Sequence, residues 1–233
     1  MNLAPGQRLS SGERSAYDVI EAGRRTPLFD FYRARKVFQD FRLAPPWLYE
    51  TGVDECLNVL IRVPTGPAAP ATDLPFELEQ VLALAEVAHR FPLPVDRIDL
   101  AEGSALVLAG LPLGELPPTE PTTRFAREVL EMVGSLHRRN LVTGGLEPSA
   151  FAFDEAGRWT FLGTGGVTLA RSDAARAADL ADWGEFCVEH LGGRAPDSTT
   201  EGGRWLAGAL RRCLASDPSR RPRSAAELLR GVR

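Results

Sequence analysis

The stretch Leu136–Asp154, LHRRNLVTGGLEPSAFAFD, decides the fold of this chain. It begins inside Thr122–Arg139, where apolar side chains recur at the spacing of an amphipathic helix. It ends with Phe151–Phe153, which a polar turn joins to Trp159–Leu162, so two short strands are expected there. The sequence therefore predicts a helix, a glycine-containing loop and a pair of strands in direct succession.

The chain differs in expected secondary structure on the two sides of this stretch. Downstream, apolar spacing predicts helices over Ala174–Leu191, Arg204–Ala215 and Ser224–Val232. Upstream, short apolar runs predict one helix, over Phe76–Ala88, and strands over Tyr17–Ile20, Phe29–Val37, Leu57–Val63, Arg97–Leu100 and Ala105–Leu108. A mainly β first half followed by a mainly helical second half is typical of an α+β fold with two lobes.

The expected division of the chain follows from these elements. Residues 1–16 are polar and are expected to form a loose lead-in. Residues 17–110 are expected to form a small, mainly β lobe with one helix, and residues 111–233 a mainly helical lobe. The proline-rich stretch Gly110–Pro121 is expected to link them, and Gln39–Asp54 to be an irregular insertion.

Three segments carry a resemblance to a known family. Leu136–Asp154 is similar to LHxxxIVHRDLKPENILLD, with Leu146 and Pro148 in register. Asp179–Pro196 resembles SDVYSLGVLLYELLTGRPP, and Cys213–Leu229 resembles CLxxDPxxRPxxxELL. In these segments and their order the chain resembles the protein kinase superfamily, and within it the bacterial eukaryotic-like Ser/Thr kinases. The resemblance implies a two-lobed protein-kinase-like fold.

The same register implies that the residues of phosphoryl transfer are missing from the second lobe. The base aspartate of HRD falls on Gly145, and the metal-binding asparagine falls on Ala150. The lysine near the γ-phosphate falls on Glu147, and the metal-binding DFG falls on Gly163-Thr164-Gly165. Both Mg²⁺ sites thus lack their main protein oxygen ligand.

The nucleotide-binding parts of the first lobe are also degenerate. The three glycine positions of the phosphate loop fall on Arg24, Thr26 and Phe29. The strand-three lysine falls on Arg62, and the helix glutamate that pairs with it falls on Glu79. Arginine does not replace lysine in a compact phosphate site, because its fork needs more room. An Arg62–Glu79 ion pair is therefore expected to be structural.

No cofactor is expected in the cleft between the lobes. The residues assigned to this vestigial cleft are Arg62, Glu79, Leu108 and Gly110. The activation segment between the DFG position and Asp179 is short: Gly166–Ala178, 13 residues, with no recognisable APE. The platform that presents a peptide substrate in the family is therefore expected to be missing.

Other positions match the family's structural residues. Asp179 matches the helix aspartate that anchors the catalytic-loop backbone, and Pro148 matches the proline of that loop. Arg221 matches the arginine that pairs with the glutamate of APE. Without that glutamate, Arg221 is expected to be unpaired or to use Glu185 or Glu189.

Composition excludes several classes of function. The chain has 233 residues and a net charge of −4, without a basic run, so a nucleic-acid partner is not expected. Cys56, Cys187 and Cys213 are far apart and are expected to be buried small hydrophobes, and no metal site is expected. Lys36 is the only lysine beside 26 arginines, which suggests a GC-rich bacterial genome. No signal peptide or membrane span is apparent, so a cytoplasmic location is expected.

The expected function is that of a catalytically inactive pseudokinase. It would act as a scaffold or allosteric regulator by binding a protein, such as an active kinase or a neighbouring subunit. One alternative is a pseudokinase that binds a nucleotide or another small molecule as a regulatory ligand. Another is an enzyme with altered chemistry that uses Glu79, Glu147 and Asp154.

Overall fold

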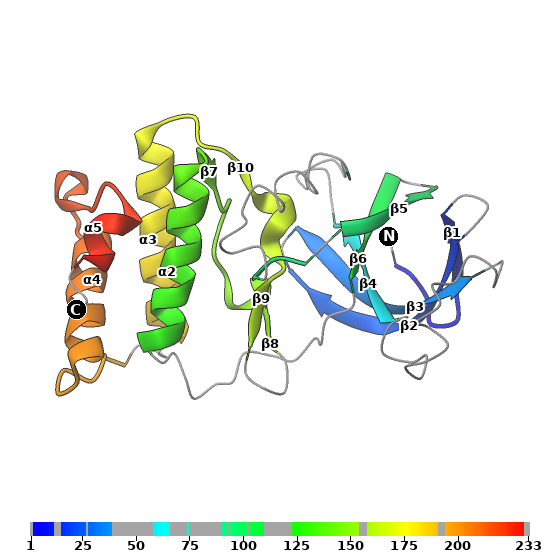
Figure 1. Cartoon of the computed structure of the whole chain (residues 1–233), viewed down its shortest axis with the longest axis horizontal. Helices are drawn as coiled ribbons and strands as arrows, with labels where there is room; N and C mark the ends of the chain where they lie inside the picture. The colour runs from blue at the N-terminus through cyan, green and yellow to red at the C-terminus, as the bar shows by residue number, and fades with distance from the viewer. Residues whose placement is uncertain are drawn as a thin grey trace. The chain divides into compact units, whose positions relative to one another are not determined.

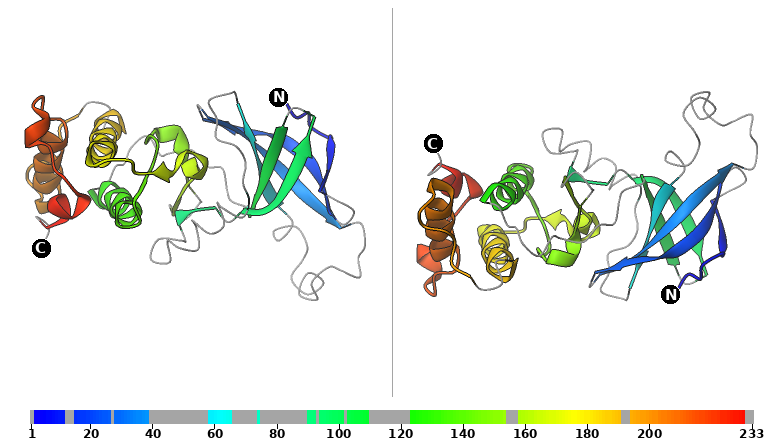
Figure 2. Two further views of the ribbon diagram at one scale, coloured as in Figure 1. Left: turned by 90° about the horizontal axis from the view of Figure 1, so that it is seen from above. Right: turned by 90° about the horizontal axis from the view of Figure 1, so that it is seen from below.

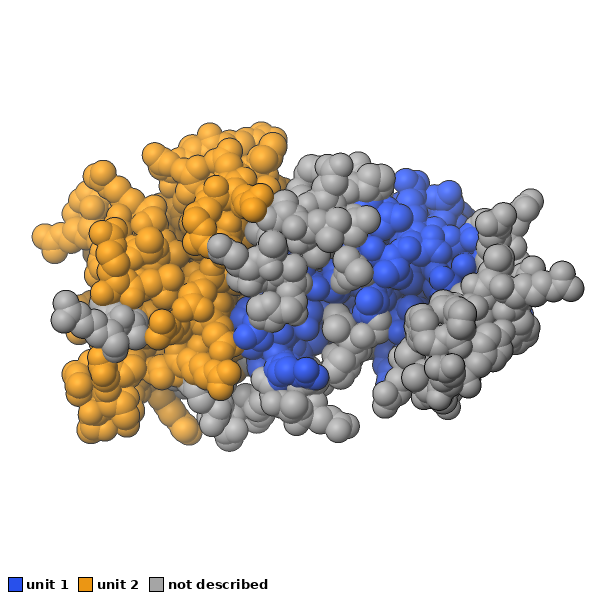
Figure 3. Space-filling view, viewed as in Figure 1, with its two compact units in different colours: residues 1–115, 152–165 blue, residues 116–151, 166–233 orange. Residues whose placement is uncertain are grey.

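The structure is a computed structural model, and it divides into two compact units (Figures 1 and 3). The first contains residues 1–115 and 152–165, and the second contains residues 116–151 and 166–233. The structure describes residues 2–11, 15–26, 28–38, 58–65, 74, 90–92, 94–101, 103–109, 123–153, 158–190 and 194–230. The expected boundary at residue 110 lies near the structural one at residue 115, but residues 152–165 group with the first unit.

A six-stranded sheet forms most of the first unit. Its strands are β1 (Arg8–Ser11), β2 (Ser15–Arg25), β3 (Phe29–Phe38), β4 (Asn58–Pro64), β5 (Pro94–Leu100) and β6 (Gly103–Ala109). Their order is β1-β2-β3-β4-β6-β5, and every neighbouring pair is antiparallel. The five strands predicted upstream of the decisive stretch are confirmed, although β2 runs five residues beyond its predicted end at Ile20.

The first strand corrects the prediction of a loose lead-in over residues 1–16. Arg8–Ser11 pair with β2, and Leu9 is buried. This strand was not predictable from apolar alternation, because RLSS is short and mostly polar. On its other side β1 lies against β5 (Figure 2). Ser11 Oγ donates hydrogen bonds to Asp96 Oδ1 at 2.7 Å and to the Arg97 carbonyl at 2.9 Å, which join the two ends of the sheet.

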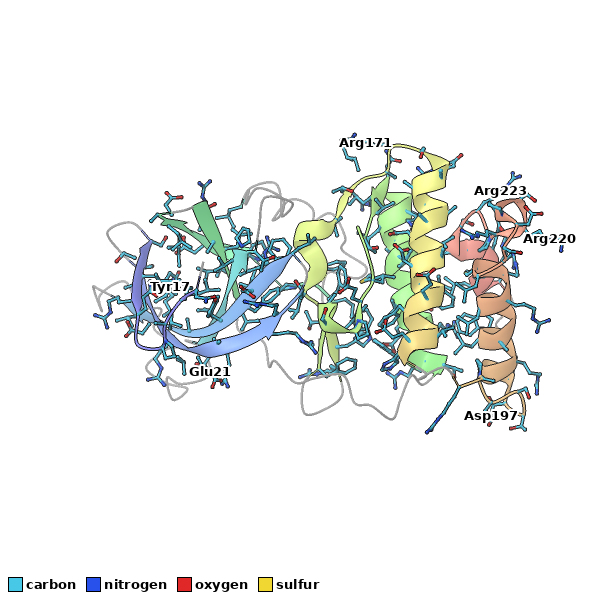
Figure 4. The ribbon with its side chains drawn as sticks, turned by 180° about the vertical axis from the view of Figure 1, so that it is seen from behind. Tyr17, Glu21, Arg171, Asp197, Arg220 and Arg223 are labelled. Carbon is cyan, nitrogen blue, oxygen red and sulfur yellow. The ribbon has the colours of Figure 1, made fainter. Side chains whose placement is uncertain are left out.

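Tyr17 supports the same junction from within the sheet (Figure 4). Its side chain is fully buried, and its hydroxyl donates a hydrogen bond to Asp96 Oδ2 at 2.6 Å. Burial raises the pKa of Tyr17, and the hydrogen bond to Asp96 adds to the rise. The phenol therefore stays protonated and remains a donor to the carboxylate.

Both faces of the sheet are covered. One face carries the larger apolar cluster, which includes Tyr17, Tyr32, Ile61 and Val107. The opposite face packs against Ala152 and Leu162 from β8 (Phe151–Phe153) and the residue after β9 (Trp159–Phe161). β8 and β9 pair with each other, as predicted. The predicted helix Phe76–Ala88, the insertion Gln39–Asp54 and the linker Gly110–Pro121 lie outside the described residues.

The second unit is built from helices. It contains α2 (Thr123–Arg138), α3 (Asp173–His190), α4 (Glu201–Cys213) and α5 (Ala225–Leu229). Short elements lie between them: β7 (Leu141–Val142), η4 (Pro148–Ala150), β10 (Thr168–Leu169) and η6 (Pro218–Arg220). The predicted helices are confirmed, with α4 starting three residues early and α5 shorter than predicted. Thr200 sets the earlier start of α4, because its Oγ1 accepts the Gly203 N–H at 3.0 Å.

Aromatic side chains hold α2 and α3 together. Phe186 stacks on Phe151 with 4.9 Å between ring centroids, and Phe125 meets Phe151 edge to face at 5.5 Å. Trp183 is fully buried, and its Nε1 donates a hydrogen bond to the Ala126 carbonyl at 3.0 Å. These contacts fix α3, which carries Asp179.

Replacing Tyr17 tests the junction between the two ends of the sheet. Tyr17→Phe removes one donor to the Asp96 carboxylate and should lower the free energy of unfolding by about 1–3 kcal/mol. Arg33→Gln is a control, because it breaks an exposed pair with Glu21 and should cost less than about 1 kcal/mol. Urea unfolding followed by tryptophan fluorescence measures both. Equal effects of the two substitutions would contradict a structural role for the Tyr17 hydroxyl.

Candidate functional site

The turn between β2 and β3 is closed by its own hydrogen bonds. The Thr26 N–H donates to the Phe29 carbonyl at 2.8 Å, and the Phe29 N–H donates to Thr26 Oγ1 at 3.0 Å. The resemblance places this turn at the phosphate loop, where backbone N–H groups bind phosphate oxygens. Here those two N–H groups are already used within the turn.

An ion pair closes the same turn from the outside. Arg25 donates two hydrogen bonds to the Asp30 carboxylate, from Nε at 2.5 Å and from Nη2 at 3.1 Å. Asp30 is buried, whereas the Arg25 side chain is 72% exposed. The hydrogen bonds to Asp30 raise the pKa of Arg25. Arg25 therefore neutralises the buried Asp30 carboxylate of its own hairpin.

Arg62 lies on β4, inside the first unit. Only 1% of its surface is exposed, and its Cζ lies 4.5 Å from the centre of the Phe29 ring. The strand register places Phe31 directly opposite Arg62. Arg62 and Phe29 occupy, by the resemblance, the positions of the ATP-binding lysine and of a loop glycine. The two replacements thus contact each other.

An apolar cluster surrounds this contact, and we call it the Phe29 cluster. Each member is at most 2% exposed: Phe29, Phe31, Leu60, Leu106, Leu108, Ala152 and Leu162. Leu108, assigned to the vestigial cleft, is thus a core residue. Glu79 and Gly110, the other assigned cleft residues, lie outside the described residues.

The loop after β7 is held by Asp179. The Asp179 carboxylate accepts the Thr143 N–H at 3.0 and 3.1 Å and the Thr143 hydroxyl at 2.5 Å. His137 Nε2 lies 3.0 Å from Asp179 Oδ2. All three side chains are buried, so the carboxylate exchanges water for protein donors. The sequence placed Asp179 at this anchor, but gave no sign that the Thr143 hydroxyl takes part.

The glycines of this loop adopt backbone conformations that favour glycine. Gly145, at the base position, has φ +122°, which strains any residue with a Cβ. Gly144 has φ +72°, and a Cβ there would lie 2.1 Å from the Gly166 carbonyl oxygen. The loop is therefore shaped for glycine at both positions.

The next positions of the loop form a short 3₁₀ turn. Pro148 begins η4 and Ala150 ends it, with the Ala150 N–H donating to the Glu147 carbonyl at 2.9 Å. Ala150 is buried and offers a methyl group where the family has a metal ligand. The Glu147 carboxylate accepts a hydrogen bond from Ser149 Oγ at 3.3 Å.

Gly163, which the resemblance places at the DFG aspartate position, belongs to the first unit and begins the 3₁₀ turn η5 (Gly163–Gly166). A Cβ on Gly163 would lie 2.4 Å from the Phe161 ring. Phe161 is fully buried and packs edge to face on Phe91, with 6.0 Å between ring centroids. An aspartate at 163 would therefore require the buried Phe161 ring to shift.

Most of residues 166–178, which the resemblance identifies as the activation segment, lie in regular secondary structure. β10 pairs with β7, with Thr168 opposite Val142 and Leu169 opposite Leu141. The Ala170 N–H donates to the Asn140 carbonyl at 2.7 Å, and α3 begins at Asp173. The stretch between the DFG position and Asp179 thus goes from a strand almost directly into a helix.

Arg221 has no carboxylate partner among the described residues, which is one of its two expected outcomes. Its Nε donates a hydrogen bond to the Ala215 carbonyl at 2.9 Å, and it binds neither Glu185 nor Glu189. This backbone oxygen is available because the chain turns through η6 just before Arg221. Arg221 therefore supports the turn between α4 and α5.

Metal-binding and thiol chemistry have no visible site within the described ranges. No group of three or more His, Cys, Asp and Glu side chains is placed there to hold a metal ion. Cys187 and Cys213 are buried, as expected, and burial raises the pKa of Cys213 to about 12 and that of Cys187 as well. Cys56 lies outside the described residues. Every described helix is too short or too polar to cross a membrane.

The role of Asp179 can be separated from that of Asp182, one turn further along α3. Asp179→Asn removes the charge that binds the Thr143 donors and should cost about 2–4 kcal/mol of unfolding free energy. Asp182 is the control, because burial and the nearby Asp179 and Glu185 carboxylates raise its pKa. Its charged form destabilises the native state above that pKa, so Asp182→Asn should be neutral or stabilising at pH 7. Guanidinium unfolding measures both, and a costlier Asp182→Asn would contradict this assignment.

Comparisons with known proteins bear on the fold. No protein-family model and no curated protein matches the chain. Among solved structures, it is similar to a Toxoplasma gondii specific rhoptry antigen kinase domain, with a TM-score of 0.58 and 15% identity over 99% of this chain and 87% of that one. The predicted fold is thereby confirmed: the chain has a protein-kinase-like fold, with a β-rich N-terminal sheet followed by a helical C-terminal part.

Proposed function

We propose that this chain is a catalytically inactive kinase-like domain that acts by binding a protein partner, as a scaffold or an allosteric regulator. One observation carries the proposal: the catalytic loop keeps its anchor and lacks its chemistry. Asp179 accepts hydrogen bonds from the Thr143 backbone, while Gly145 stands two residues later at the base position.

The loop has no group at position 145 to accept the substrate's proton. A general base must lie within hydrogen-bond reach of that proton, and the family supplies an aspartate for this step. Gly145 has no side chain, and its φ of +122° disfavours any residue that has one. Position 145 thus lacks a proton-accepting side chain, and its backbone conformation disfavours one.

The metal-binding positions lack oxygen ligands in each unit considered by itself. Mg²⁺ is bound in kinases through the catalytic-loop asparagine and the DFG aspartate. Ala150 is a buried methyl group, and Gly163 has the Phe161 ring where a side chain would begin. Without these ligands, the charge that develops on the transferred phosphoryl group has no metal to neutralise it.

A protein partner accounts best for what the chain retains. Fold alone assigns no function, so the proposal rests on the contrast between a preserved core and an emptied site. Trp183, Phe186 and Asp179 keep α3 packed and hydrogen-bonded. A well-packed core keeps the protein surface in one conformation, which favours the binding of a protein partner. The partner proposed is a kinase or a neighbouring subunit of the same assembly.

Phosphoryl transfer is the direct test of inactivity. With labelled ATP and either Mg²⁺ or Mn²⁺, neither the chain itself nor a generic protein substrate should gain label above a protein-free blank. Restoring the side chains in Gly145→Asp/Ala150→Asn/Gly163→Asp should also give no activity, because positions 145 and 163 do not accept a Cβ without strain. Transfer by the wild-type chain that is lost in Arg62→Ala would refute the proposal.

Co-purification tests the binding role. The tagged chain, expressed in its native host, should recover one protein in stoichiometric amount, and the same protein should be recovered with Glu147→Ala, which changes the exposed loop carboxylate. Cross-linking before lysis keeps weak complexes. A chain that runs alone in size-exclusion chromatography after cross-linking would count against a scaffold.

A further inference from the structure

We propose that the nucleotide face of the first unit's sheet is filled permanently by the chain's own side chains and locked by the β2–β3 turn. The first unit then offers no nucleotide site on this face of its sheet. This inference concerns nucleotide binding and is separate from phosphoryl transfer. A chain that bound ADP without transferring phosphate would overturn it and leave the proposed function intact.

The position of Arg62 identifies the face concerned. In kinases the strand-three lysine reaches the phosphates, so the nucleotide lies on the face to which that side chain belongs. Side chains two residues apart along a strand share a face, which places Leu60 with Arg62. Phe31 lies directly opposite Arg62 on β3, and Phe29 follows on the same face.

No space remains on this face within the Phe29 cluster. Phe29 is 2% exposed, and Phe31 and Leu60 are each 1% exposed. A pocket for a ligand of nucleotide size occupies at least about 300 Å³ and is open to solvent before binding. Apolar rings and side chains that solvent does not reach occupy this face instead.

The contact between Phe29 and Arg62 gives the buried guanidinium one favourable electrostatic neighbour. The guanidinium lies 4.5 Å from the ring centre, in the geometry of a cation–π contact. Phe29 stands at a loop glycine and Arg62 at the ATP-binding lysine. The ring therefore takes the place beside the cation that phosphate would take in an active kinase.

The turn holds Phe29 in that place, and its bonds form a latch. Two hydrogen bonds, of 2.8 and 3.0 Å, join Thr26 and Phe29. Arg25 donates two more to the Asp30 carboxylate. The Thr65 N–H donates to the Leu28 carbonyl at 3.0 Å and ties the turn to the end of β4. Lifting Phe29 away from Arg62 would strain or break several of these bonds together.

The latch is tested by amide hydrogen exchange and by nucleotide titration. In the wild-type chain the Thr26 and Phe29 amides should exchange on the order of a thousandfold more slowly than in a free peptide. Millimolar ADP or ATP should leave the melting temperature unchanged, with or without Mg²⁺. A melting temperature that rises with ADP, or turn amides that exchange freely, would overturn the inference.

A pair of variants shows whether the named bonds are responsible. Thr26→Val/Asp30→Asn removes the hydroxyl that accepts the Phe29 N–H and the charge that holds Arg25, keeps Phe29 and the backbone bonds of the turn, and should speed exchange of the Phe29 amide by at least about tenfold. The α2 amides should stay protected, which shows that the chain still folds. Arg33→Gln breaks an exposed pair on the same hairpin and should change neither region. Unchanged exchange at Phe29 in the latch variant would refute the role given to the turn.

Discussion

The buried carboxylate of Asp179 is the constraint on which the helical unit depends. A charge that leaves water must find donors inside the protein, and Asp179 finds the backbone and hydroxyl of Thr143. This requirement fixes the start of the catalytic loop relative to α3. The anchor depends on the Thr143 backbone and hydroxyl and on no side chain of positions 144–150, so the start of the loop is held whatever residues occupy those positions.

Most of the fold was predictable from apolar periodicity. Strands such as Leu57–Val63 and helices such as Thr122–Arg139 carry long, regular patterns, and both are confirmed. The strand β1 was missed because four mostly polar residues give no alternation to read. Its place is decided by tertiary contacts with β2 and β5, and these depend on residues such as Asp96 that lie far away in the sequence.

The positions of the candidate site were assigned by register with a known family, and that assignment of Gly145, Ala150 and Gly163 stays a prediction. The contacts around the site were not predictable. Register could not show that Phe29 and Arg62 contact each other, because that contact joins two strands and depends on which way both side chains point. The hydrogen bond of Arg221 was unpredictable for a related reason: its acceptor is a backbone carbonyl, which any residue supplies.

The junction of β1 with β5 has a consequence for how partners are recognised. A strand at the edge of an open sheet exposes backbone groups that can recruit an extra strand from another chain. In this sheet the two end strands lie against each other, bridged by Ser11 and Asp96. Strand addition at those edges would have to displace one of the protein's own strands. Recognition at these two edges is therefore expected to use side chains rather than an added strand.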